Sequence, residues 1–370
     1  MLSFDRPNFN PSRLALARRR RGLTKVQLAE KLGLTYRALV GYEIGEYPPS
    51  PEMLDTISEK LEFPAEFFLG SDLESVAARD VSFRSLSKMT AKHREIALAQ
   101  SELALYLSKW LEERFELPLV DLPEHHLGAA DPEGAAEALR SYWGLGQLAI
   151  RNVVHLLESK GVRVFSLNLE TSDVDALSTW KGGMPFVFLN GYKTPERGRF
   201  DAAHELGHLI LHKHGAPLGR VAEDEAHRFA SAFLMPRANV LAHAPRFASI
   251  PEFIKLKKIF GVSLAAINYR LHELKLTSDW HYRSLSIELS KRGFRTNEPE
   301  PIERESSLVL PMVLGRLYEE GYTRARIAQE LGLPLSELES LLFSLVMTGV
   351  DGGRTTGNGN TGRANLRLIK

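Results

Sequence analysis

Residues 199–212 read RFDAAHELGHLILH, and the motif His204-Glu-Leu-Gly-His208 inside this stretch is the feature on which the interpretation rests. On a helix, two imidazoles four residues apart lie on one face, about 6 Å from each other, and can bind one divalent ion. Glu205 between them is placed to act as a general base on a water molecule held by that ion. A pair of structural histidines would give the same pattern, so the hypothesis of a metal site needs a third ligand.

Acidic residues that could supply the third ligand occur a short distance downstream. Residues 222–236, AEDEAHRFASAFLMP, predict a helix that ends at Pro236. Its core-facing stripe comprises Ala226, Phe229, Ala230, Phe233 and Leu234. Glu225 lies at the edge of this stripe and is expected to point towards the protein, whereas Glu223 and Asp224 are expected to lean outwards.

Together the two motifs resemble the ImmA/IrrE family of metallopeptidases, over roughly residues 150–275. The resemblance implies a zincin-like domain whose metal ligands are His204, His208 and Glu225, with Glu205 as catalytic acid and base. The implied cofactor is Zn²⁺, with Mn²⁺ as the alternative. His227 stands where the family usually has Asn or Asp, and its role is open.

His214 is a rival third ligand, because it follows His204 by ten residues, as in metzincin proteases. That geometry needs a glycine at position 211 to turn the chain, and this chain has Leu211. We therefore favour Glu225, and expect His212 and His214 to complement the dipole at the end of the helix.

Composition limits the class of protein. The chain has 370 residues, no cysteine and a net charge of +1. It is long enough for two or three domains, disulfides are excluded, and any metal must be bound through N and O atoms. No stretch is long and apolar enough to span a membrane, and the N-terminus lacks the pattern of a signal peptide. We expect a cytoplasmic protein without a membrane partner.

The first 70 residues predict five short helices, the second and third separated by the turn Gly33-Leu34. The strings at residues 23–35 and 41–51 closely resemble the Xre/Cro repressor family. The resemblance implies that the protein binds a double-stranded DNA operator as a homodimer on two half-sites. It assigns base or phosphate contacts to Gln27, Thr35, Tyr36, Arg37 and Val40, and further phosphate contacts to some of residues 18–21. The alternative is a protein-interaction bundle with a solvated run of arginines.

The middle of the chain predicts a long helix over residues 90–114, a helix from Asp131 to Tyr142, and three strands over 161–167, 174–180 and 185–190. A strand at the edge of such a sheet can bind an extended substrate, and the strand over 174–180 is our candidate. Downstream of the second motif, an oxyanion-stabilising residue would come from Tyr269, Arg270 or His243.

Residues 323–342 resemble a second helix-turn-helix, although its second helix begins with Ser336-Glu-Leu-Glu and is therefore acidic. A packing or dimerisation role and DNA contact are both open for this segment. We predict an α+β, mostly helical protein with a five-helix bundle, a central zincin-like domain with a small sheet, and a C-terminal helical region. The expected divisions are 1–70 (DNA binding), 71–145 (helical linker), 146–278 (metallopeptidase-like), 279–348 (C-terminal helices) and 349–370 (disordered tail).

The leading hypothesis is a DNA-binding transcriptional regulator whose metal-dependent endopeptidase domain cleaves a protein such as a partner repressor. The first alternative is a repressor whose metal domain senses a ligand or partner without proteolysis. The second is an antitoxin-like binding protein. Sequence does not identify the substrate, the operator, the physiological metal or the activating signal.

Overall fold

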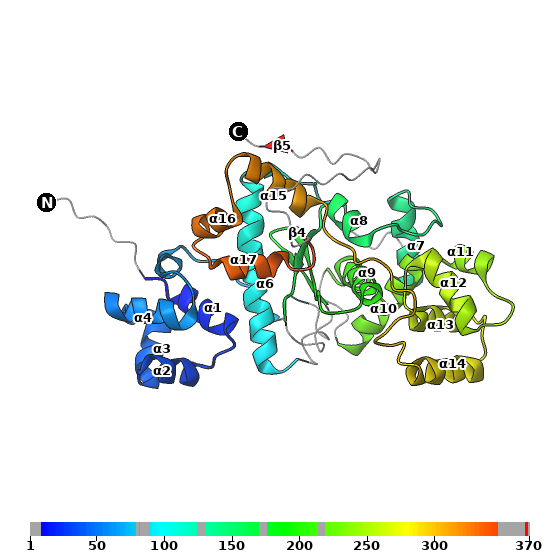
Figure 1. The fold of residues 1–370 in the computed structure, drawn as a ribbon, viewed down its shortest axis with the longest axis horizontal. Helices are drawn as coiled ribbons and strands as arrows, with labels where there is room; N and C mark the ends of the chain where they lie inside the picture. The colour runs from blue at the N-terminus through cyan, green and yellow to red at the C-terminus, as the bar shows by residue number, and fades with distance from the viewer. Residues whose placement is uncertain are drawn as a thin grey trace.

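The structure is a computed structural model that describes residues 9–78, 81, 89–123, 131–169, 176–213, 219–346 and 367–368. Figure 1 shows three parts in a row: a small helical bundle formed by the N-terminal residues, a central region built around one long upright helix, and a group of helices at the far end. The small sheet lies between the long helix and the far group. The predicted α+β, mostly helical fold is confirmed.

The N-terminal bundle has the predicted order of helices, and its ends lie where the capping residues place them. Thr24 and Thr35 accept hydrogen bonds from backbone amides as N-caps, and Gly33 and Gly45 end their helices in the left-handed conformation. The fifth segment is a short 3₁₀ helix rather than an α-helix. The elements are α1 (Pro11–Arg20), α2 (Lys25–Leu32), α3 (Tyr36–Ile44), α4 (Pro51–Leu61) and η1 (Ala65–Leu69).

The long central helix α6 (Ala91–Glu112) is buried along most of its length after its first turn. It packs against α1 of the N-terminal bundle, so the bundle and the rest of the chain share one core. The strand β1 (Phe115–Glu116) follows it and pairs with β5 (Arg367–Leu368). The other residues of the predicted disordered tail, 349–366 and 369–370, lie outside the described residues.

Three strands form the small sheet in the order β2-β4-β3: β2 (Arg163–Ser166), β3 (Ala176–Lys181) and β4 (Met184–Leu189). β2 runs parallel to β4, while β3 pairs with β4 as an antiparallel hairpin. Among the strands that the structure describes, β3 is therefore an edge strand, as the sequence suggested. On its outer edge, Val81 forms an antiparallel bridge with Thr179.

The helix α9 covers the side of the sheet formed by β3 and β4, and α10 lies against α9. α9 packs on both of these strands, and α10 packs along α9 and on α7. Further helices extend the domain away from the sheet. The elements are α7 (Pro132–Tyr142), α8 (Val153–Ser159), α9 (Pro195–Leu211), α10 (Arg220–Leu234), α11 (Arg237–His243), α12 (Ile250–Phe260), α13 (Leu264–Glu273) and α14 (Asp279–Lys291).

The C-terminal helices return to the middle of the molecule, beside α6 (Figure 1). They are α15 (Val309–Glu319), α16 (Arg324–Glu330) and α17 (Leu335–Leu342), and α17 packs on β2. Within the described ranges, none of the helices combines the length and apolarity needed to cross a membrane.

Candidate metal centre and nucleic-acid interface

The helix that carries the His-Glu-x-x-His motif is α9, and local sequence sets its start. Thr194 accepts a hydrogen bond from the Arg197 amide as N-cap, and Pro195 occupies the first turn, where its missing N–H costs nothing. His204 and His208 then lie on the same face, with their Nε2 atoms 3.1 Å apart. The spacing of the motif is thereby converted into two converging nitrogen atoms.

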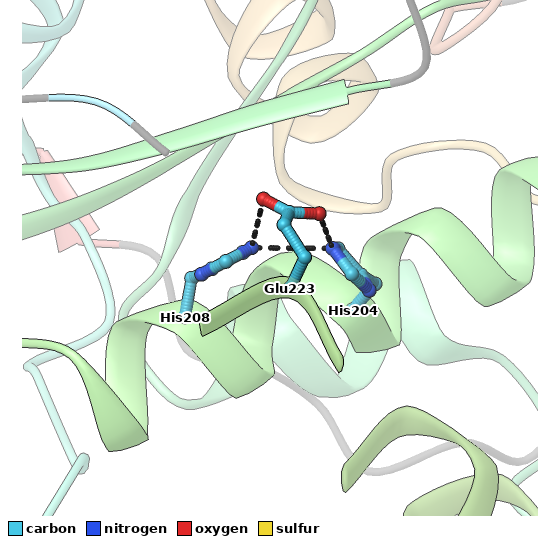
Figure 2. Close-up of side chains that lie close together, drawn as sticks. All are labelled: His204, His208 and Glu223. Atoms are coloured by element: carbon cyan, nitrogen blue, oxygen red, sulfur yellow. Dashed lines mark hydrogen bonds and ion pairs between the residues drawn. The ribbon is translucent and has the colours of Figure 1, made fainter. Parts of the chain in front are cut away.

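The third group at this position is Glu223, from the first turn of α10 (Figure 2). One of its carboxylate oxygens lies 3.2 Å from Nε2 of His204, and the other lies 3.2 Å from Nε2 of His208. The donor atoms of the three residues are all within 4.8 Å of one another. Two imidazole nitrogens and one carboxylate oxygen form a donor set that suits Zn²⁺ in a catalytic site, which leaves a fourth position for water.

The charge of Glu223 is stabilised by the two imidazoles. Burial by itself would raise the pKa of the Glu223 carboxyl, but hydrogen bonds from His204 and His208 outweigh burial and hold that pKa well below its usual range. The carboxylate is therefore ionised at neutral pH, as a metal ligand must be.

Glu225, the acid that the sequence favoured, is not at this position. Its Oε2 lies 3.0 Å from Nε2 of His212, one helical turn beyond His208. The orientation assumed for Glu223 and Glu225 from the apolar stripe was wrong: Glu223 is 5% exposed, whereas the side chain of Glu225 is 33% exposed. Glu223 precedes the fully buried Ala226 by three residues, a helical spacing that could have drawn attention to it.

The crossing of α10 over α9 decides which of the two acids meets the histidines. A Cβ added to Gly207 would lie 3.2 Å from Ala226, so the two helices approach closely at this point. The first turn of α10 is thereby brought against the histidine face of α9. The rival ligand His214 lies outside the described residues.

Glu205 lies on the side of α9 that packs on the sheet. It is 1% exposed, and the Ser178 hydroxyl of the edge strand β3 donates a hydrogen bond of 2.6 Å to its Oε2. The candidate general base is thus held between the metal-site helix and the strand that was predicted to bind substrate.

Other residues singled out by the sequence lie around this site in different roles. The ring centroid of His227 is 6.4 Å from that of His204. The same ring packs edge-on to Tyr269, with centroids 5.0 Å apart. Burial raises the pKa of Tyr269. Arg270 is buried and bonded to the Met235 carbonyl, Glu133 and Glu273, so its role is structural.

The predicted DNA-contacting residues lie at the front of α3 and the start of α2. Thr35, Tyr36 and Arg37 are exposed, and Val40 is half-buried. Gln27 is exposed, and its side-chain oxygen accepts a hydrogen bond from the Thr24 amide in a capping box. The residues at the start of α3 therefore form a solvent-facing polar surface of the kind that enters a major groove.

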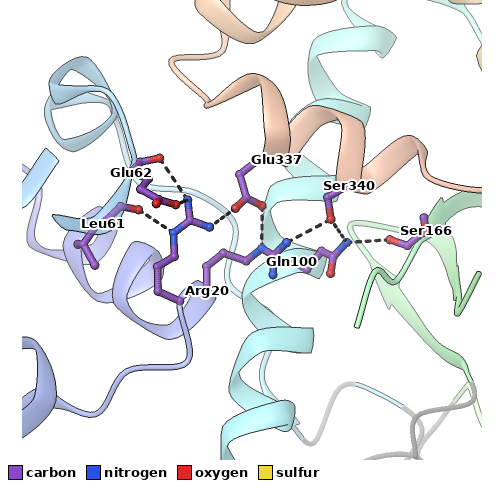
Figure 3. A network of polar contacts seen from close by, with 8 residues as sticks. Arg20, Leu61, Glu62, Gln100, Ser166, Glu337 and Ser340 are labelled. Carbon is purple, nitrogen blue, oxygen red and sulfur yellow. Dashed lines mark hydrogen bonds and ion pairs between the residues drawn. The ribbon is translucent and has the colours of Figure 1, made fainter. Parts of the chain in front are cut away.

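The arginine run at the end of α1 does not form such a surface, contrary to the expectation that some of its members bind phosphates. Each of the four guanidinium groups pairs with a carboxylate of the same chain. Arg18 binds Glu43 and Arg19 binds Glu102 of α6. Arg20 binds Glu337 of α17 (Figure 3), and Arg21 binds the same carboxylate. The run thus joins the N-terminal bundle to the rest of the molecule.

Figure 3 shows that this contact continues to the sheet. Arg20 donates to the Ser340 hydroxyl, and the Gln100 amide bonds both Ser340 and the Ser166 carbonyl at the end of β2. Glu337 and Ser340 are buried. The helix that resembles a second reading helix is therefore a packing element.

Two family models match the chain. A helix-turn-helix model matches residues 14–68, and a model of the IrrE N-terminal-like domain, a peptidase-family model, matches residues 157–272. The second range contains all three donors of the candidate metal site and Glu205. Comparison with curated proteins found no match.

Proposed function

Because the chain joins an Xre-type helix-turn-helix domain to an ImmA/IrrE domain, we propose that it is a DNA-binding transcriptional regulator carrying a metal-dependent endopeptidase. Its substrate would be a peptide bond in another protein, such as a partner repressor. The convergence of His204, His208 and Glu223 on one point, beside Glu205, carries this proposal.

The protein side chains divide the chemistry between them. His204, His208 and Glu223 would hold Zn²⁺ or Mn²⁺, which when bound makes water a better nucleophile and polarises a carbonyl. Glu205 takes one proton from the attacking water while the water oxygen forms a bond to the carbonyl carbon of the peptide. The same carboxyl then delivers that proton to the leaving nitrogen as the C–N bond breaks. Ser178 positions Glu205 by its hydrogen bond to Oε2.

The edge strand β3 offers a place for the substrate backbone. Ser178, which bonds Glu205, is next to Thr179, whose outer edge already accepts Val81 in an antiparallel bridge. An extended peptide added along this edge would run beside the candidate base. It would have to replace the contact with Val81.

For DNA we propose recognition by the start of α3, with Thr35, Tyr36 and Arg37 directed at base edges and Gln27 at the backbone. A single domain of this size binds DNA weakly, and a homodimer that contacts two half-sites would bind the operator more tightly. A regulator of this kind acts in the cytoplasm, where both DNA and partner repressors are found.

The test of proteolysis uses the full-length protein with a peptide library and with candidate repressors, with and without Zn²⁺ or Mn²⁺. Cleavage detected by mass spectrometry should require metal and fall by about 10²–10⁴-fold in Glu205→Gln, because that variant loses general base catalysis. Asp224→Asn, an exposed position on α10, is the matched control and should keep full activity. Cleavage that survives Glu205→Gln would refute the role of Glu205.

A second candidate function is a repressor whose metal domain acts as a sensor without cutting a protein. The contact chain from β2 through Gln100 and Ser340 to Arg20 favours it, because it links the sheet beside the metal site to the DNA-binding bundle. This function predicts no cleavage by the loaded protein, together with operator binding that changes when Zn²⁺ is added or chelated.

A further inference from the structure

Two residues outside the three candidate ligands form a chain of contacts that begins on His208. The Nδ1 atom of His208 lies 2.9 Å from Nδ1 of His212, and Nε2 of His212 lies 3.0 Å from Oε2 of Glu225. The two rings are inclined at 53° with centroids 5.1 Å apart. The chain therefore runs from the metal-site face of α9 to α10, through His212, the C-cap of α9.

When a metal ion is bound, Nε2 of His208 no longer donates to Glu223, and with both imidazoles neutral the contacts then admit one arrangement of protons. His208 must present a lone pair at Nε2 towards the metal position, so its proton is on Nδ1. That proton is donated to Nδ1 of His212, which must then be the acceptor. The proton of His212 is consequently on Nε2 and is donated to the Glu225 carboxylate.

We infer that His212 and Glu225 are positioning residues that hold His208 in its Nδ1-protonated form, with Nε2 directed at the metal position. The inference rests on the proposed metal site and adds two residues to it. A carboxylate at the end of such a chain increases the electron density that the ligating nitrogen can donate. His212 is held for this role by burial, since only 9% of its side chain is exposed.

Glu225 has the properties of an outer member of the chain. Its side chain is 33% exposed, so its charge keeps part of its hydration while one oxygen accepts from His212. Glu223, two residues earlier, bonds the Nε2 atoms of both ligating histidines directly. Of the two acids of α10, Glu223 thus contacts both ligating histidines directly, whereas Glu225 reaches His208 alone, through His212.

The first experiment uses the Zn²⁺-loaded, ¹⁵N-labelled wild-type protein and long-range ¹H–¹⁵N correlation spectra, which distinguish the two neutral forms of each histidine. We expect a proton on Nδ1 of His208 and on Nε2 of His212. A proton on Nε2 of His208 would overturn the inference. This readout depends neither on catalysis nor on any substitution.

The second experiment measures the affinity for Zn²⁺ by competition with a chelator. Glu225→Ala and His212→Ala should each weaken binding about 10–100-fold, the usual cost of losing an outer-shell partner. Glu225→Gln should recover most of the affinity, because its carbonyl oxygen still accepts from His212. Asp224→Ala, next to Glu225 but exposed, should match wild type.

Affinities of Glu225→Ala and His212→Ala within twofold of wild type would refute the inference. His204→Ala separates this result from failure of the proposed metal site. If wild type and His204→Ala bind Zn²⁺ equally, the metal site itself is wrong. If His204→Ala abolishes Zn²⁺ binding while Glu225→Ala leaves it intact, the metal site is supported and the positioning role of Glu225 is refuted.

Discussion

The molecule contains two helix-turn-helix segments whose local structures are similar and whose surroundings differ. In α2–α3, Thr24 caps the first helix and Gly33 turns the chain; in α16–α17, Thr323 and Gly332 do the same. The start of α3 faces solvent, whereas α17 buries one face, with Glu337, Leu338 and Leu341, and packs on β2. The same turn chemistry has produced one candidate reading helix and one packing helix.

The difference shows that capping and turn residues specify where the two helices begin and end but not what the second helix contacts. Glu337 stands in the first turn of α17, where a negative charge would be unfavourable to a phosphate backbone. In the structure it binds Arg20 and Arg21 instead. The acidic start of α17 is thus complementary to the basic end of α1.

The largest effect that we expect comes from truncating the buried face of α17. Leu341 is fully buried, so Leu341→Ala should lower the free energy of unfolding by about 2–5 kcal/mol through lost contacts and a cavity. Tyr36→Ala at the exposed start of α3 should change it by no more than about 0.5 kcal/mol. Chemical denaturation measures both, and equal effects would contradict the assigned environments.

A smaller loss of stability should follow removal of the charge that joins α17 to α1. Glu337→Ala leaves two arginines without their shared carboxylate and should cost about 1.5–3 kcal/mol, as for a hydrogen bond to a charged group. Glu339→Ala, on the same helix but exposed, is the control and should be nearly neutral. Thermal melting of the two variants decides whether the contact stabilises the protein.

For DNA affinity, in contrast to stability, substitutions in α3 should have a larger effect than substitutions in α17. Arg37→Ala at the front of α3 should weaken binding to the operator by about 1–3 kcal/mol, because a guanidinium contact to a base edge is lost. Ser336→Ala at the corresponding place in α17 should leave the affinity unchanged. Fluorescence anisotropy with a labelled operator, selected from a random library, measures both. A loss in Ser336→Ala would give α17 a role in DNA binding.

The smallest expected effect concerns the salt dependence of the same equilibrium. Because Arg20 pairs with Glu337, Arg20→Gln should leave the slope of log K against log salt unchanged. Loss of a true phosphate contact would reduce the magnitude of that slope by about 0.9. A reduction of this size would show that Arg20 leaves Glu337 when DNA binds.

Local features of the chain were predictable because each depends on atoms only a few residues apart. Thr24, Thr35 and Thr194 cap their helices through hydrogen bonds within one turn, and the order of helices and strands agrees closely with the periodicity. The juxtaposition of His204 and His208 also follows from spacing alone. One exception is η1, where five residues after Pro64 make a 3₁₀ turn around the buried Phe67 and Phe68.

By itself the sequence determined the positions of the helices, the pair of histidines and the exposed polar start of α3. Only the tertiary structure decided that Glu223 rather than Glu225 meets the histidines, because that choice depends on how α10 crosses α9. It also decided the partner of Arg21, a carboxylate 316 residues away, which no local pattern indicates. Capping and periodicity act within a turn or two of helix, whereas ion pairs and ligand sets form wherever packing brings distant side chains together.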